Sequence, residues 1–245
     1  MGLFNRSASK LDGRTVLLFA ADPGDALTQA VHLYDPGVRS WPGRLIFANG
    51  VLLFGPVAVT PKLEQQAGLP PGMTVAYYVG AALQSHAGRR AHEDKQGDGD
   101  LLVQGLAGRL GGTVTAAEPL PEPELTFSVW GDQAIPPEQV IELLRPYDEG
   151  EFKVADRTKN SYSLYGVGTY LLVSYWSPQL YTEKDAPPAV RALRSQPLHH
   201  WDLSVGRSRK AAAAGVPGRA REAALALAAR CGGIPLDEYQ FPLTS

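Results

Sequence analysis

The sequence contains a single cysteine, Cys231, among 245 residues. One thiol can form neither an internal disulfide nor a zinc site built from several cysteines, so the chain suits a reducing compartment. An excess of charge of one sign is also missing, because 23 basic and 25 acidic side chains leave a net charge of -2. This balance gives no overall electrostatic footprint for nucleic acid. We therefore expect a cytoplasmic protein and no general affinity for nucleic acid.

A long uninterrupted hydrophobic run is absent as well. The most apolar stretch, residues 45–59, is broken by Asn49-Gly50 and by Gly55-Pro56. It falls short of the roughly 20 apolar residues that a membrane-spanning helix needs. The opening residues 1–12 lack the apolar core of a secretory signal. We expect no membrane span, and a flexible N-terminal tail over residues 1–12.

Sequence motifs that carry well-known chemistry are missing. The chain has no phosphate-binding P-loop, no Gly-x-Ser-x-Gly nucleophile turn and no His-Glu-x-x-His zinc helix. A lone Gly-x-Gly at residues 166–168 lies between two strand-like runs, where a turn is the simpler interpretation. These absences favour a protein that is not an enzyme and that uses no cofactor.

What the sequence does contain is an internal repeat. Apolar residues at helical spacing occupy residues 27–34 and again residues 140–147. Both runs end in a tyrosine, Tyr34 or Tyr147, and these lie 113 residues apart. An Asp-x-Gly triplet follows each tyrosine and is expected to end the helix. The matching positions indicate two copies of one unit.

A second shared motif closes each half of the chain. Residues 106–112 and 227–233 both read Leu-Ala-x-Arg-x-Gly-Gly. Each follows an apolar stripe that predicts a helix, and its first glycine can adopt the left-handed conformation common after a helix end. Extended segments follow at residues 113–116 and 234–241.

Strand-like runs, rich in β-branched and aromatic residues or flanked by turn signals, lie before and between these helices. They comprise residues 15–20, 44–48, 51–54 and 74–79 in the first half, and residues 125–130, 152–155, 161–165, 169–176 and 201–205 in the second. Each half thus reads β-α-β-β-(β)-α-β, the order of a ferredoxin-like α+β unit. Polar residues 84–100 are expected to form a mobile loop that carries His86 and His92.

The fold expected is therefore α+β, a tandem duplication of a ferredoxin-like unit forming a pseudo-dimer. The first repeat covers residues 13–117 and the second covers residues 125–245. Residues 118–124 are acidic and rich in proline, so they are expected to form a short, semi-rigid linker.

Aromatic residues cluster in the second half. Strict alternation through residues 162–176 would place Tyr162, Tyr170 and Trp176 on one sheet face, with Trp130 on a neighbouring strand. Tyrosine and tryptophan are enriched in protein interfaces, so Trp130, Tyr162, Tyr170 and Trp176 are candidate partner-binding residues. Packing of the same rings inside the fold is an equally open alternative.

Two polar groupings are further candidates. Strand alternation would place His200 and Asp202 on one face beside His199, but the sequence offers no third ligand, so we expect no metal site. Basic residues Arg207, Arg209 and Lys210 could bind an anion, although charge runs in loops are usually solvated surface.

The stretches 106–115 and 227–237 resemble the closing element of small α+β immunity proteins from bacterial toxin systems. The resemblance implies a non-catalytic inhibitor that binds its toxin tightly. The leading hypothesis is thus a non-enzymatic, cytoplasmic protein-binding module, an immunity protein or adaptor whose partner is another protein.

Two alternatives stay open. One is a dimeric α+β barrel enzyme with a pocket between the halves, in which His199 or His200 would be the candidate haem ligand. The other is nucleotide or RNA binding through Arg207, Arg209 and Lys210.

Overall fold

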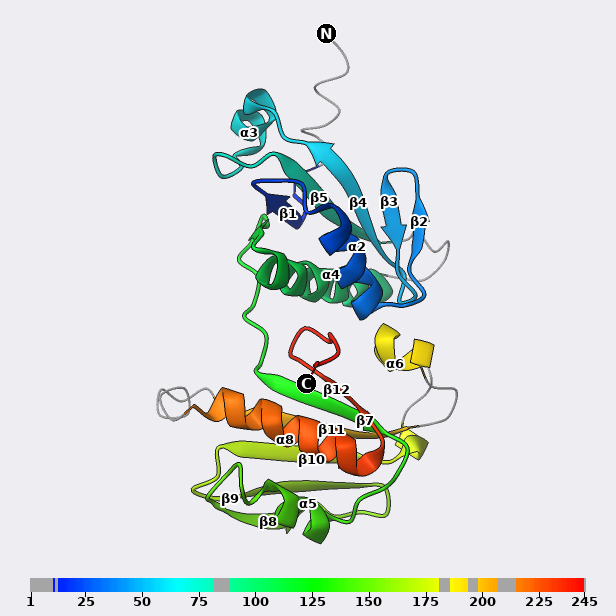
Figure 1. Ribbon diagram of the computed structural model, residues 1–245, viewed down its shortest axis with the longest axis vertical. Coiled ribbons are helices and arrows are strands. Elements are labelled where there is room, and N and C mark those ends of the chain that lie inside the picture. The colour runs from blue at the N-terminus through cyan, green and yellow to red at the C-terminus, as the bar shows by residue number, and fades with distance from the viewer. Residues whose placement is uncertain are drawn as a thin grey trace. The chain divides into compact units, whose positions relative to one another are not determined.

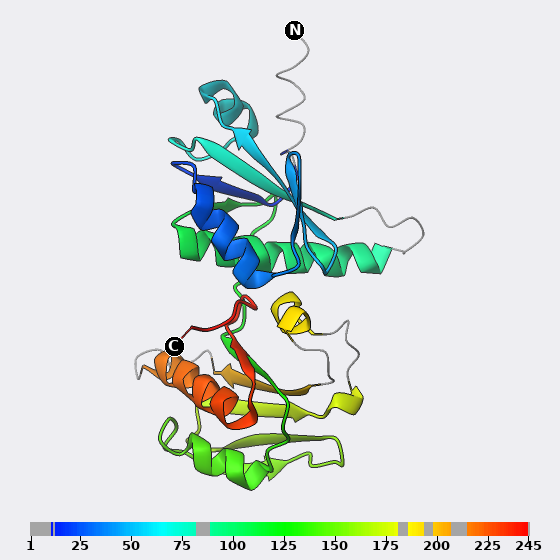
Figure 2. The same cartoon turned by 45° about the vertical axis from the view of Figure 1, so that its right-hand side comes forward.

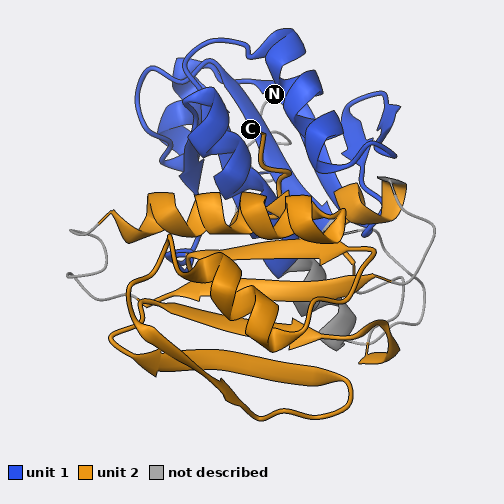
Figure 3. Ribbon diagram, turned by 60° about the horizontal axis from the view of Figure 1, so that its bottom comes forward, with its two compact units in different colours: residues 1–122 blue, residues 123–245 orange. Residues whose placement is uncertain are grey.

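The chain divides into two compact units, residues 1–122 and 123–245 (Figure 3). The computed structural model describes residues 11, 13–81, 89–180, 186–193, 198–206 and 215–244. The boundary between the units falls inside the proline-rich segment 118–124. The candidate anion-binding residues Arg207, Arg209 and Lys210 lie outside the described residues, as does His86.

The first unit forms an antiparallel sheet in the order β2-β3-β4-β5-β1-β6 (Figure 1). Its elements along the chain are β1 (Val16–Phe19), α2 (Gly24–Tyr34), β2 (Arg39–Trp41), β3 (Arg44–Ile46), β4 (Val51–Ala58), α3 (Pro61–Ala67), β5 (Val75–Ala81), α4 (Arg89–Leu110) and β6 (Thr113–Thr115).

The second unit forms an antiparallel sheet in the order β12-β7-β11-β10-β9-β8 (Figure 1). Its elements are β7 (Thr126–Gly131), α5 (Pro137–Leu144), β8 (Glu151–Ala155), β9 (Ser161–Val167), β10 (Leu171–Trp176), the 3₁₀ turn η1 (Pro178–Leu180), α6 (Pro188–Leu193), β11 (His199–Val205), α8 (Val216–Cys231) and β12 (Ile234–Leu236).

The two sheets have the same topology. The two strand orders are identical when β1 to β6 are matched in sequence to β7 to β12 and the second order is read from its β8 end. Four strands of each unit, such as β6-β1-β5-β4, have the split β-α-β arrangement of ferredoxin-like folds, and two further strands extend the sheet beside them. The predicted tandem duplication of an α+β unit is confirmed. Both sheets are open at their edges, so the described strands form no closed barrel.

Two helices cover one face of each sheet, which we call the helix face. In unit 1, α2 and α4 pack against each other, and α4 lies along β4, β5 and β1 (Figure 2). In unit 2, α5 and α8 lie side by side on the sheet (Figure 3). The apolar residues of α8, including Ala220, Ala224 and Leu227, are fully buried against the sheet. Burial of these stripes is the main favourable term in forming each layer.

A short helix inserted between two strands lies over the opposite face of each sheet. In unit 1, Leu63 of α3 packs against Val16 and Leu18. In unit 2, Val190 of α6 packs against Trp130. Both insertions occupy the same place in the topology, although neither was predicted from the sequence. Helices of six or seven residues carry too little periodicity to be recognised.

A buried aspartate marks the same position in both units. Asp35 follows α2 and accepts hydrogen bonds from the backbone N–H groups of Gly37 (2.9 Å) and Ala48 (2.6 Å). Asp148 lies 113 residues later and accepts from Gly150, Tyr170 and Leu171 (3.1, 2.8 and 2.9 Å). Asp35 is 1% exposed and Asp148 is 2% exposed. The aspartate of the triplet, predicted only as part of a helix stop, therefore also ties the segment after each helix to a neighbouring hairpin.

The Gly-Gly motif also has one structural role in both units. The first glycine, Gly111 or Gly232, adopts positive φ (69° and 64°), as predicted for a helix cap. The second lies where a side chain would collide with the neighbouring strand. A Cβ on Gly112 would lie 3.0 Å from the Leu18 oxygen, and one on Gly233 would lie 2.7 Å from the Trp130 oxygen.

The expectation of a mobile loop over residues 84–100 is wrong for its described part, because α4 begins at Arg89. The polar composition and the glycines of this segment disfavour a helix locally. Tertiary packing reverses that preference. Gly99 is buried where α4 crosses β5, and a Cβ there would collide with the side chain of Val79.

Candidate functional site

The sheet of unit 2 has a polar face, opposite the helix face. Its side chains come from alternate positions of all six strands, and the pairing of the strands places them in rows. Its central strands and β9 contribute Thr126, Ser128, Trp130, Ser161, Ser163, Tyr165, Val167, Leu172, Ser174, Trp176, His200, Asp202 and Ser204. Hydroxyl groups dominate the middle of this face.

A row of three stacked rings crosses one end of the polar face. Trp176 lies opposite His200, and His200 lies opposite Trp130. The imidazole stacks on Trp130 at 4.1 Å between ring centroids and on Trp176 at 5.2 Å. Trp130 is only 4% exposed, because Val190, Leu198 and Leu236 pack against it, whereas Trp176 is half-buried.

Next to this row, Asp202 joins two side chains. Its Oδ1 lies 2.8 Å from His200 Nε2 and accepts a hydrogen bond from the Ser128 hydroxyl at 2.6 Å. The prediction that His200 and Asp202 share a face is confirmed. In a nucleophilic triad the serine would bond to the histidine, which removes its proton. Here the serine donates to the carboxylate instead, so the arrangement holds the ring in place and does not activate Ser128.

The other end of the polar face exposes apolar side chains. Tyr165 and Val167 of β9 are 52% and 77% exposed, and Leu172 of β10 is 43% exposed. Val173 pairs with Leu164 in the antiparallel register. Leu172 therefore lies opposite Tyr165, one residue along from that pair. We call Tyr165, Val167 and Leu172 the apolar patch.

Charged and hydroxyl side chains surround the apolar patch. On one side, the edge strand β8 places Lys153 opposite Tyr165 and Glu151 opposite Val167. On the other side, Ser204 lies opposite Leu172. An exposed apolar patch with a polar rim is typical of protein interaction sites.

The prediction that Tyr162 and Trp176 share a face is wrong. Tyr162 pairs with Tyr175 and faces α5 and α8, where it is 6% exposed. Its hydroxyl donates to the Ile135 oxygen (3.0 Å) and accepts from Trp201 Nε1 (3.1 Å). Counting by twos from 162 to 176 fails because the chain turns at Gly168, which breaks the alternation.

Tyr170 also differs from the predicted placement. It lies at the end of the hairpin between β9 and β10, where its ring packs against the helix-face core. Of the four predicted partner-binding residues, the polar face therefore brings together Trp130 and Trp176 and leaves out Tyr162 and Tyr170.

His199 lies on the helix face, one residue before His200. Its Nδ1 is 2.8 Å from the Tyr175 hydroxyl, and its ring stacks with Tyr175 and lies tilted against Trp201. Burial lowers the pKa of His199 and raises that of Tyr175, because an apolar environment disfavours the charged form of each group. Both groups are therefore neutral near pH 7, as members of an aromatic cluster.

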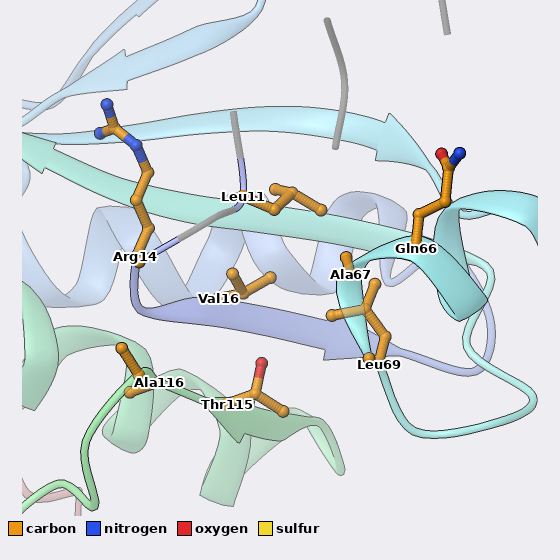
Figure 4. Close-up of a pocket in the computed structure, with 11 residues that line it drawn as sticks. Leu11, Arg14, Val16, Gln66, Ala67, Leu69, Thr115 and Ala116 are labelled. Carbon is orange, nitrogen blue, oxygen red and sulfur yellow. The ribbon is translucent and has the colours of Figure 1, made fainter. Parts of the chain in front are cut away.

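Unit 1 contains a cavity of about 440 Å³ on the face that α3 covers (Figure 4). Its walls are mixed, because Leu11, Val16 and Leu69 supply apolar surface while Arg14, Gln66 and Thr115 of the edge strand β6 supply polar surface (Figure 4). The guanidinium group of Arg14 lies over the Tyr78 ring, at 5.4 Å from its centroid. The cavity offers room for side chains of mixed polarity, and its described lining contains no cluster of acid or base groups.

Within the described residues, no three His, Cys, Asp or Glu side chains gather closely enough to hold a metal ion. None of the described helices combines the length and the apolar character of a membrane span. Comparison of the chain with protein-family models, with curated proteins and with solved structures gave no match.

Proposed function

We propose that the protein is a non-enzymatic binding module that recognises another protein through the polar face of unit 2. The observation that carries this proposal is the apolar patch, whose three side chains are 43–77% exposed on adjacent strands. A rigid sheet presents them without the entropy cost of ordering a loop. An immunity protein or adaptor would act in this way.

The chemistry of the polar face supports binding over catalysis. Serine hydroxyls such as Ser174 and Ser204 can donate and accept hydrogen bonds at an interface rim. Trp176 adds a large half-buried ring at the end of β10 opposite to Leu172. Asp202 holds both Ser128 and His200, an arrangement that gives recognition groups a fixed geometry but supplies no activated nucleophile.

Affinity capture with the full chain tests this proposal. Tagged wild-type protein and the variants Tyr165→Ala and Leu172→Ser would be incubated with lysate of the source organism, and retained proteins would be quantified. We expect one stoichiometric protein with the wild type and at least a tenfold weaker capture by either variant, because interface anchors contribute about 2 kcal/mol or more.

Trp41→Ala is the matched control, because Trp41 is an exposed aromatic residue (56%) on an edge strand of unit 1. Capture by this variant should equal that of the wild type, and all variants should keep the wild-type melting temperature. Equal capture by the patch variants and the wild type would reject the polar face as the binding surface. Capture of no stoichiometric protein at all would reject protein binding as the function.

A further inference from the structure

The outer edges of the two sheets differ at equivalent strands. In unit 2, the chain turns after β12 at residues 237–240 and returns along the outer edge of that strand. Leu236 pairs with Pro242 in an antiparallel bridge. The Leu243 N–H donates to the Pro235 oxygen, and the Asp237 N–H donates to the Phe241 oxygen, both at 2.9 Å. The chain thus covers this edge with its own C-terminal segment.

The equivalent edge in unit 1 is β6. Among the described residues, β6 pairs with β1 alone. The register is the same in both units, since Val114 pairs with Leu17 as Pro235 pairs with Val129. Because the Pro235 carbonyl points outward, the Val114 carbonyl and N–H also point outward. Val114 therefore offers one donor and one acceptor, whereas Pro235 offers an acceptor only.

Cavities flank this edge on both faces of the sheet. The 440 Å³ cavity borders Thr115 on the α3 side, next to Val16 and Leu69 (Figure 4). A second cavity of about 590 Å³ borders Val114 on the helix side, next to Gln104 and Leu120. Successive side chains of a strand point to opposite faces, so an added strand would place its side chains alternately in the two cavities.

We propose that β6 binds an extended segment of a protein partner as a seventh, antiparallel strand, with apolar side chains in the helix-side cavity and polar or small side chains in the α3-side cavity. The return segment of unit 2 shows the geometry of such an occupant, with its Phe241 fully buried and Leu243 packed against the helix-face core. Strand addition gains affinity from backbone hydrogen bonds and selectivity from alternate side-chain pockets, and β6 supplies both. This surface lies in unit 1 and is independent of the polar face of unit 2.

The test uses linear peptides selected from a random phage-displayed library on the full-length wild-type protein. Each selected peptide would be synthesised, and its Kd would be measured for the wild type, Val114→Pro and Val114→Ala. We expect peptides with apolar residues at alternate positions. Val114→Pro should weaken them at least tenfold because it removes the outward donor, whereas Val114→Ala should bind within threefold of the wild type.

Proline at this position is compatible with the fold, because unit 2 has Pro235 there. A second variant, Ala67→Phe, leaves the strand unchanged and fills the 440 Å³ cavity from α3. It should weaken the same peptides, while amide exchange at Val114 should slow when a peptide binds to the wild type. Selection of no such peptide, or equal binding by Val114→Pro, would overturn the proposal.

Discussion

Replacing Asp148 with alanine tests the role given to the duplicated aspartates. The carboxylate is 2% exposed and accepts three backbone hydrogen bonds, from Gly150, Tyr170 and Leu171. The alanine side chain cannot accept any of these hydrogen bonds, and the Leu171 N–H is buried. The substitution therefore leaves backbone donors without an acceptor where the start of β10 meets the end of α5.

The expected magnitude follows from these three bonds. A hydrogen bond to a charged group contributes about 1.5–3 kcal/mol, and water can replace part of the bond at the partly exposed Gly150. We expect Asp148→Ala to lower the free energy of unfolding by about 3–6 kcal/mol. Asp35 accepts two such bonds, so Asp35→Ala should cost about 2–4 kcal/mol. Glu149→Ala is the control, because Glu149 is the exposed neighbour of Asp148.

Urea unfolding measures both effects in the full chain. Tryptophan fluorescence reports mainly on unit 2, which contains Trp130, Trp176 and Trp201, and circular dichroism reports on both units. Asp148→Ala should shift the fluorescence transition to lower urea, and Asp35→Ala should shift it far less than the dichroism transition. A change below about 0.5 kcal/mol for Asp148→Ala, like that of an ordinary surface substitution, would refute the account of this residue.

Three further predictions concern the cores of the units. Burial lowers the pKa of His199, so as the pH falls below about 6.5 the imidazole gains a proton in the unfolded chain before it does so in the folded chain. The free energy of unfolding should therefore fall from pH 7.5 to pH 5 more in the wild type than in His199→Gln. The control His32→Gln, on the exposed side of α2, should follow the wild type. Gly233→Ala should destabilise the protein by about 1–3 kcal/mol, because its Cβ would meet a backbone oxygen at 2.7 Å. Gly108→Ala, which has open space around it, should be neutral or stabilising. Equal melting temperatures of the two variants would count against the close packing described at Gly233. Tyr162→Phe should cost about 1–3 kcal/mol by leaving a buried carbonyl and an indole N–H unbonded, and an unchanged urea midpoint would contradict that network.

The repeat was predictable because its signals are local. The apolar runs that end in Tyr34 and Tyr147 each have strong periodicity and a following Asp-x-Gly triplet, and both Gly-Gly motifs stop a helix. The first helix ends at Tyr34 itself, whereas α5 ends three residues earlier, at Leu144. Those local signals could not show which distant backbone groups the aspartate side chain binds. Asp148 bonds to residues more than twenty positions away, and only the folded hairpin brings them together.

The candidate site was predictable only in part. Trp176 stands out as an aromatic residue on a strand, but the face it occupies depends on where the hairpin turns. Alternation counted within β9 alone, Ser161-Tyr162-Ser163-Leu164-Tyr165, would have separated the buried Tyr162 from the exposed Tyr165. The edge of β6 that no described strand covers left no local signal, because it stands out only by comparison with the C-terminal segment that covers β12 in the other unit.

The most direct test of the central claim is hydrogen–deuterium exchange of the full chain, alone and in complex with the protein it captures. Binding through the polar face predicts slowed exchange in β9 and β10, with little change in α5 and α8 on the opposite side of the same sheet. Slowed exchange confined to α5 and α8, or unchanged exchange throughout unit 2, would contradict it.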